Sequence, residues 1–204
     1  MTSSNQPHDQ PTQQPGNDRE TDATSRRIAP LLRRWPTLAG LAFAALTAFD
    51  LAGGVELATV LAASAVVYLG TAALGRPGAA WPMFFATFAI IAVAKLVDDR
   101  FEPTWAVLGA GILLLVYGLL RGAIRPRHGL PLQTIALLGF GAAATLALFI
   151  NPALGGYLVA LGLLGHAAWD VYHYRANRVV ARSLAEFCLV LDTALAVAIV
   201  IAQA

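Results

Sequence analysis

Charged residues are scarce in this sequence, and their scarcity excludes an ordinary water-soluble domain. Only 13% of the 204 residues are Asp, Glu, Lys or Arg, whereas 57% are hydrophobic and the mean hydropathy is +0.63. A soluble domain usually carries about 25% charged residues. Because the deficit extends over several long apolar runs, the composition predicts a polytopic membrane protein with the lipid bilayer as its main partner.

Cysteine and signature motifs are nearly missing as well. A single cysteine, Cys188, excludes an internal disulfide and any metal site built from cysteines alone. Its position in an apolar segment favours a small buried side chain. The sequence contains no Walker A, G-x-S-x-G, H-E-x-x-H or dinucleotide-binding motif, so soluble nucleotide-dependent chemistry has no support.

The positive charge of the chain does not indicate a nucleic-acid partner. The net charge is +2 and the isoelectric point is near 9.0. The arginines lie in short loops between apolar segments, where membrane topology accounts for them. We therefore expect no nucleic-acid binding.

Two regions follow from the distribution of apolar residues. Residues 1–30 are rich in Gln, Pro, Ser, Thr and Asp and hold almost nothing apolar, which predicts a disordered cytoplasmic tail. No apolar core appears until after Trp35, so the tail is not a signal peptide. Residues 31–204 form the expected transmembrane domain.

Seven apolar segments follow, each close to the ~20 residues that cross ~30 Å of hydrocarbon as a helix. Their approximate bounds are 36–53, 55–75, 79–97, 103–120, 131–150, 153–172 and 184–203. Proline falls at or near several of the starts, where the missing N–H costs little. The sequence thus predicts an all-α fold, a bundle of seven transmembrane helices.

Loop charge predicts the orientation of this bundle. Arginines precede the first segment and occupy the loops after the second, fourth and sixth, whereas the charges of the opposite side, around residues 50–56 and 95–102, are mainly acidic. The positive-inside rule makes the arginine-rich side cytoplasmic. We expect the N-terminus inside, the C-terminus outside, and a multi-pass location in the plasma membrane.

The sixth segment carries an unusual polar face. Gly155, Gly162, His166, Asp170 and His173 follow one another at intervals of seven, four, four and three residues, which place all five on one face of an α-helix. Ionisable groups facing lipid are costly, so this face should look into the bundle.

The seventh segment adds two acids, Glu186 and Asp192. Asp192 lies nine residues after Ser183, roughly 13 Å into the membrane, and His166 should lie at a similar depth on the antiparallel neighbour. Asp170, His173 and Glu186 should form a second layer nearer the cytoplasm. These five ionisable residues (His166, Asp170, His173, Glu186 and Asp192) are the candidate binding or proton-relay site, and no catalytic residue is assigned.

Two of these acids also have structural interpretations. Ser183-x-x-Glu186 matches a capping box, in which Glu186 would bond back to the start of its helix. Asp170 has Arg178 and Arg182 within reach as helix-end partners. Either interpretation would remove the acid from the site.

The remaining polar residues differ in how readily they can be explained. His173, Tyr172 and Tyr174 are expected at the membrane interface, where their polar ends reach water. An Asp near the helix centre costs ~2.5–3.5 kcal/mol on insertion scales. Asp192 therefore needs a partner, for which His166 is the first choice.

Surface features give two further expectations. Lys95 is three and four residues from Asp98 and Asp99, which predicts a local ion pair near the outer surface. Gly118-x-x-x-Gly122 has the small-residue spacing that lets helices approach closely, which serves either packing within the bundle or a homo-oligomer.

Three classes of function fit these residues, and the order of preference begins with transport. Intramembrane carboxylate–histidine pairs are typical of proton relays, which favours small-solute or proton-linked transport or sensing. This hypothesis expects Asp192 and His166 to border a wet cavity that continues outward. The sparse polar groups of the outer half argue against it.

The alternatives are a metal-dependent intramembrane hydrolase and a non-catalytic scaffold or partner subunit. His, Asp and Glu suit zinc or iron, with His166, Asp170, His173, Glu186 and Asp192 as the available ligands. The helix arrangement resembles the progestin/adiponectin receptor and alkaline ceramidase superfamily in architecture alone. That family places an H-x-x-x-H pair in its last helix, where this chain has no histidine, so no residue role is carried over.

Overall fold

The computed structural model describes residues 34–49, 51, 53–98 and 100–204. The predicted disordered tail over residues 1–30 lies outside the described residues. Residues 36–204 form one compact unit, the helical bundle.

Seven α-helices make up the described chain, and no strand occurs among its residues. They are α2 (Trp35–Ala48), α3 (Ala58–Leu74), α4 (Ala80–Val97), α5 (Pro103–Leu120), α6 (Leu130–Ala147), α7 (Pro152–Ala176) and α8 (Arg182–Ala202), with the short 3-10 turns η1 (Val55–Leu57) and η2 (Pro77–Ala79) before α3 and α4. The predicted all-α fold is confirmed for this part of the chain.

Six of these helices are long and apolar enough to span a membrane, with η1 and η2 counted as the first turns of α3 and α4. The exception is α2, whose 14 residues measure roughly 21 Å at ~1.5 Å per residue, less than the ~30 Å of a hydrocarbon core. The length and composition of these helices are thus those of a multi-pass helical bundle. A seventh membrane crossing stays a prediction.

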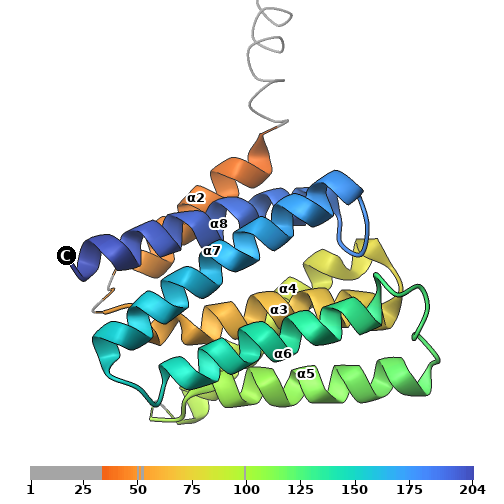
Figure 1. The fold of residues 1–204 in the computed structure, drawn as a ribbon, viewed down its shortest axis with the longest axis horizontal. Coiled ribbons are helices and arrows are strands. Elements are labelled where there is room, and N and C mark those ends of the chain that lie inside the picture. Colours follow the sequence, from red (N-terminus) through yellow and green to blue (C-terminus); the bar gives the residue numbers. More distant parts are fainter. Residues whose placement is uncertain (1–33, 50, 52, 99) are drawn as a thin grey trace, which may run out of the picture. The chain divides into compact units, whose positions relative to one another are not determined.

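Helix α3 is the centre of the bundle. Thirteen of its 17 residues are buried, and it contacts α4, α5, α6 and α7. Helices α7 and α8 pack along each other, and Figure 1 shows α3 to α8 joined by loops that alternate between the two ends. Polar side chains on α3, α7 and α8 are therefore placed to meet inside the bundle.

Local sequence signals account for where several helices begin. Pro103 and Pro152 occupy the first positions of α5 and α7, where no intrahelical N–H is needed. The side chains of Glu102 and Asn151 cap the same helices by accepting the backbone N–H groups of Thr104 and Ala153. These caps fix the start of α7, which carries most of the candidate site.

Small residues permit the close packing of α7. A Cβ on Gly155 would lie 2.5 Å from the carbonyl oxygen of Ala147, and one on Gly162 would lie 2.4 Å from Leu61. Gly118 likewise packs within the bundle, against Leu130 and Ala73.

The expectation of a helical Gly118-x-x-x-Gly122 face is wrong. Helix α5 ends at Leu120, and Gly122 adopts a positive φ of 70° in the turn that follows. The two glycines therefore do not share one helical face, and this motif no longer supports a homo-oligomer.

Candidate functional site

The core of the site is a hydrogen bond between α7 and α8. His166 Nδ1 lies 2.8 Å from Asp192 Oδ2, and both residues are 0% exposed. The pairing predicted from their equal depth on antiparallel helices is present. A buried acid thus has the partner that its desolvation requires.

Asp170 belongs to the same cluster, one helical turn beyond His166. Its Oδ2 lies 3.4 Å from His166 Nδ1, and its Oδ1 accepts a hydrogen bond of 2.5 Å from the hydroxyl of Tyr68 on α3. Tyr68 and Asp170 are both 0% exposed. The alternative interpretation, in which Asp170 pairs with Arg178 or Arg182, is wrong, because Asp170 bonds to Tyr68 of the central helix instead.

Three buried atoms of this cluster have no hydrogen-bond partner. They are His166 Nε2, Asp170 Oδ2 and Asp192 Oδ1. Leaving such groups unsatisfied costs about 1–3 kcal/mol each, so native proteins seldom do so without a reason. We call Tyr68, His166, Asp170 and Asp192 the acid–imidazole cluster.

The charges of the acid–imidazole cluster leave room for a further cation. With Tyr68 neutral and the other three groups ionised, one imidazolium faces two carboxylates, for a net charge of −1. The nitrogen and carboxylate oxygens of His166, Asp170 and Asp192 lie within 4.8 Å of one another. Such a group can share a mobile proton or hold a metal ion.

His173 belongs to a second buried network, toward the end of α7. Its Nδ1 lies 2.9 Å from the carbonyl oxygen of Trp169, and its Nε2 lies 2.9 Å from Nε2 of Gln133. The carbonyl can only accept, so Nδ1 carries the proton and Nε2 accepts from the amide. Trp169 Nε1 in turn donates to Gln133 Oε1 at 3.2 Å.

The predicted interfacial position of His173 is therefore wrong. Its exposed fraction is 1%, whereas the neighbouring Tyr172 and Tyr174 are 46% and 40% exposed, as expected for residues that reach the surface. The bond to Gln133 of α6 explains the difference, because it draws the ring inward.

The ring of Tyr68 lies between the two networks. It makes edge contacts with His166 and His173 at centroid distances of 5.2 and 4.9 Å. Phe140 of α6 covers another side of His166 at 5.1 Å. Tyr68 thus fixes the position of both imidazoles as well as that of Asp170.

Glu186 lies apart from the acid–imidazole cluster. Its Oε1 accepts the hydroxyl of Thr37 of α2 at 2.5 Å. The expected second layer of Asp170, His173 and Glu186 is therefore wrong, because each of the three has a different partner.

The capping box is not formed either. Ala181 is the N-cap of α8 and provides no side-chain cap, and Ser183 Oγ accepts the indole N–H of Trp81 at 3.0 Å. Both Ser183 and Glu186 are used to bind α8 to other helices.

Tyr68 and Gln133 were not identified from sequence. Tyr68 lies in an apolar segment, where a tyrosine is an unremarkable core residue. Gln133 carried a usable signal, since an amide inside a membrane-length apolar segment needs partners. The sequence did not indicate which helix would supply them.

A cavity of about 250 Å³ lies between α2, α3, α4 and α8. Glu56 and Lys95 line it near the end of the bundle that holds the α4–α5 loop, and Cys188 and Leu191 line it at mid-depth. Asp192 follows Leu191 directly but does not line this cavity. The expectation that Asp192 and His166 border it is not met.

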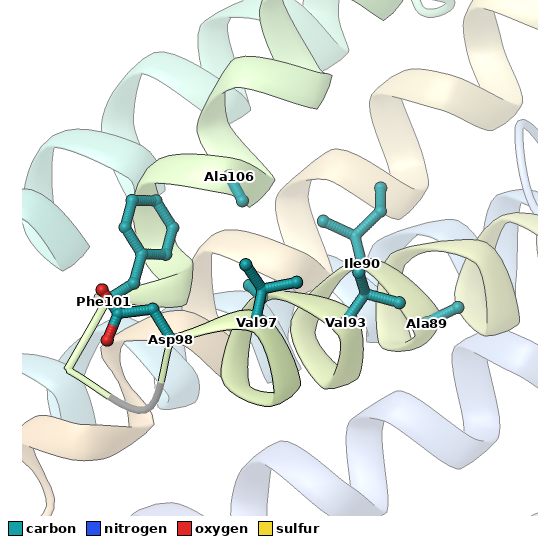
Figure 2. A pocket seen from close by; sticks show the side chains of 8 residues that line it. Ala89, Ile90, Val93, Val97, Asp98, Phe101 and Ala106 are labelled. Carbon is teal, nitrogen blue, oxygen red and sulfur yellow. The ribbon is translucent and has the colours of Figure 1, made fainter.

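A second hollow is an open groove on the outside of α4 and α5. Figure 2 shows its side chains, which are apolar except for Asp98. The Asp98 carboxylate already accepts the backbone N–H of Arg100 at 2.9 Å. The described residues of this surface offer contact area for hydrocarbon but no convergent polar groups.

No family model matches the chain, and the searches of curated proteins and of solved structures found no match either.

Proposed function

We propose that the protein is a polytopic membrane protein that links proton exchange at His166, Asp170 and Asp192 to transport or sensing of a small solute. The observation that carries the proposal is a fully buried chain of contacts from Asp192 through His166 and Asp170 to Tyr68. Buried ionisable groups at membrane depth are typical of proton pathways.

The geometry suits a proton that moves between the two carboxyl groups. The Asp192 carboxyl gives its proton to His166 Nδ1 at 2.8 Å, and Nδ1 passes it to Asp170 Oδ2 at 3.4 Å. His166 Nε2 keeps its own proton throughout. The Tyr68 hydroxyl donates to Asp170 Oδ1, which holds this carboxyl group in place and leaves Oδ2 to take the proton.

The orientation is part of the same proposal. Within the bundle, the α3–α4, α5–α6 and α7–α8 loops lie together at one end and carry arginines, whereas the α4–α5 loop at the other end is mainly acidic. The positive-inside rule makes the arginine end cytoplasmic. The membrane that we propose is the plasma membrane. The cavity lined by Glu56 and Lys95 then opens toward the outside.

Proton movement in proteoliposomes tests this function. Vesicles with a trapped pH-sensitive dye and an imposed potential should acidify with the wild type, and Asp192→Asn or His166→Gln should lower the rate at least about tenfold. Asp98→Asn and His128→Gln serve as matched controls outside the cluster. Wild-type rates in folded Asp192→Asn and His166→Gln variants would refute the proposal.

A metal-dependent intramembrane hydrolase is the second candidate, favoured by the convergence of three ligands. His166, Asp170 and Asp192 match the imidazole-and-carboxylate ligands of zinc or iron sites, and catalytic zinc commonly has three protein ligands. A bound metal would supply an activated water for hydrolysis. The three residues would hold and orient it, and the bundle would limit access of other water.

Metal analysis of the purified protein separates the two candidates. Stoichiometric zinc or iron in the wild type and in His128→Ala, but lost in His166→Ala, supports the hydrolase. The proton-linked function is supported if wild-type protein that has been exposed to zinc or iron retains less than one metal ion per several chains.

A further inference from the structure

The cavity between α2, α3, α4 and α8 has the shape and size of a small-ligand site. Its volume of about 250 Å³ is just below the ~300–1,000 Å³ of drug-sized ligand pockets. It reaches from the acidic end of the bundle to the depth of Cys188. A ligand of amino-acid size fits such a space, whereas a full lipid does not.

The wall of this cavity is aromatic. Phe43 of α2 makes edge contacts with Phe84 and Phe88 of α4, each at a centroid distance of 5.7 Å. All three rings line the cavity. They provide an apolar surface that favours an aromatic or branched aliphatic group.

Opposite charges border the mouth of the same cavity. Lys95, the only lysine of the chain, forms no ion pair with another described residue, and the expected pair with Asp98 is absent. The other expected partner, Asp99, lies outside the described residues. Glu56 lines the same mouth and accepts the backbone N–H of Gly53 at 3.1 Å.

One further polar group lies deeper in the cavity. Ser64 of α3 is 8% exposed and makes no hydrogen bond with another residue of the described chain. The hydroxyls of Thr47 and Thr87, in contrast, bond to carbonyls of their own helices. Ser64 and Lys95 thus retain donors for a ligand.

We propose that this cavity binds a small zwitterion with an apolar side chain, an apolar α-amino acid or a close analogue. The ligand carboxylate meets Lys95, its ammonium meets Glu56, and its side chain contacts the three phenylalanines. The two opposite charges at the mouth, Lys95 and Glu56, favour a zwitterion over a ligand that is only an anion or only a cation. This names the solute class of the proposed proton-linked function, and its coupling to protons rests on that function.

Binding to the purified full-length protein tests the inference with defined probes. We expect radiolabelled L-phenylalanine or L-leucine to bind saturably. Phenylpropionate, which lacks the ammonium, and phenethylamine, which lacks the carboxylate, should compete at least about tenfold more weakly. Equal competition by either analogue would overturn the zwitterion assignment, and failure of both amino acids to bind would overturn the site.

Variants locate the binding. Lys95→Met and Glu56→Gln should each weaken it at least about tenfold, and Ala63→Phe should abolish it by filling the cavity. Ala106→Phe, in the groove of Figure 2, is the matched control and should bind as the wild type does. Unchanged binding in folded Lys95→Met and Ala63→Phe would place the ligand elsewhere and refute the inference.

The only cysteine offers a second readout without mutation. Cys188 lines the cavity, so bound L-phenylalanine should slow its reaction with methyl methanethiosulfonate. An unchanged reaction rate at saturating ligand would contradict the site. Binding is measured on protein in detergent and is therefore independent of the flux assay in vesicles. Proton flux without amino-acid binding would overturn only this inference. Amino-acid binding without proton flux would overturn only the proposed function.

Discussion

His166 of α7 and Asp192 of α8 form a 2.8 Å hydrogen bond between two fully buried side chains. Twenty-six residues separate them in sequence, and the antiparallel packing of α7 on α8 brings them together. His166 provides a charge partner for the buried acid, and Asp192 provides a hydrogen-bond acceptor for the buried imidazole.

The energetic dependence of this pair can be measured by replacing both residues. His166→Leu or Asp192→Leu alone should lower the free energy of unfolding by about 3–5 kcal/mol, because the other group is left buried without its partner. The double variant should lose much less than the sum. Thermal unfolding in detergent gives all three values, and strict additivity would show that the two residues are independent.

The same double variant distinguishes a scaffold from a proton pathway. If the pair only fixes helix packing, the double variant should regain both stability and any measured activity. The proposed function predicts regained stability without proton flux. Buried ion pairs are often replaceable at no cost to stability, which makes the separation of the two readouts practicable.

Replacing Tyr68 should disturb the cluster without changing its acids. Tyr68→Phe leaves Asp170 Oδ1 without its donor and should cost about 1.5–3 kcal/mol of unfolding free energy, the usual value for a hydrogen bond to a charged group. Tyr117→Phe is the matched control, since its hydroxyl bonds only to exposed Arg121 and its loss should cost less than about 0.5 kcal/mol. Equal effects would mean that Tyr68 does not support Asp170.

Close helix packing predicts opposite outcomes for two glycines. Gly155→Ala should destabilise by about 1–3 kcal/mol, because the new methyl group would lie 2.5 Å from a backbone oxygen. Gly139→Ala in α6 meets open space and should be neutral or stabilising by up to about 1 kcal/mol. A stable Gly155→Ala variant would contradict the contact between α6 and α7.

The proposed orientation can be tested by thiol labelling of intact cells. In a Cys188→Ser background, a membrane-impermeant maleimide should label Asp98→Cys in the α4–α5 loop directly. Gly78→Cys, in the loop before α4, should react only after the membrane is opened. The reverse pattern would invert the topology, and labelling of both in intact cells would argue against membrane insertion as proposed.

The sequence was sufficient for the helices because their signals are local. Each apolar run defines a helix independently of its neighbours, and prolines such as Pro103 and Pro152 mark where some of the helices begin. The pairing of His166 with Asp192 was also predictable, since depth along two consecutive antiparallel helices follows from residue number alone.

Contacts between helices distant in sequence were not predictable in this way. Tyr68 bonds to Asp170 across 102 residues, and Gln133 meets His173 across 40. Which helices become neighbours depends on the packing of many apolar side chains, and apolar spans of similar composition carry little information about that order. Glu186 was misplaced for the same reason, because its partner Thr37 is 149 residues away.

The most direct test is whether the acid–imidazole cluster exchanges a proton with water. Infrared titration of the purified protein resolves the C=O stretch of protonated carboxyl groups, and difference spectra of Asp192→Asn and Asp170→Asn assign the bands. The account predicts a band that grows on acidification and is lost or shifted in each variant but not in Asp98→Asn. A spectrum in which these two variants match the wild type at every pH would contradict it.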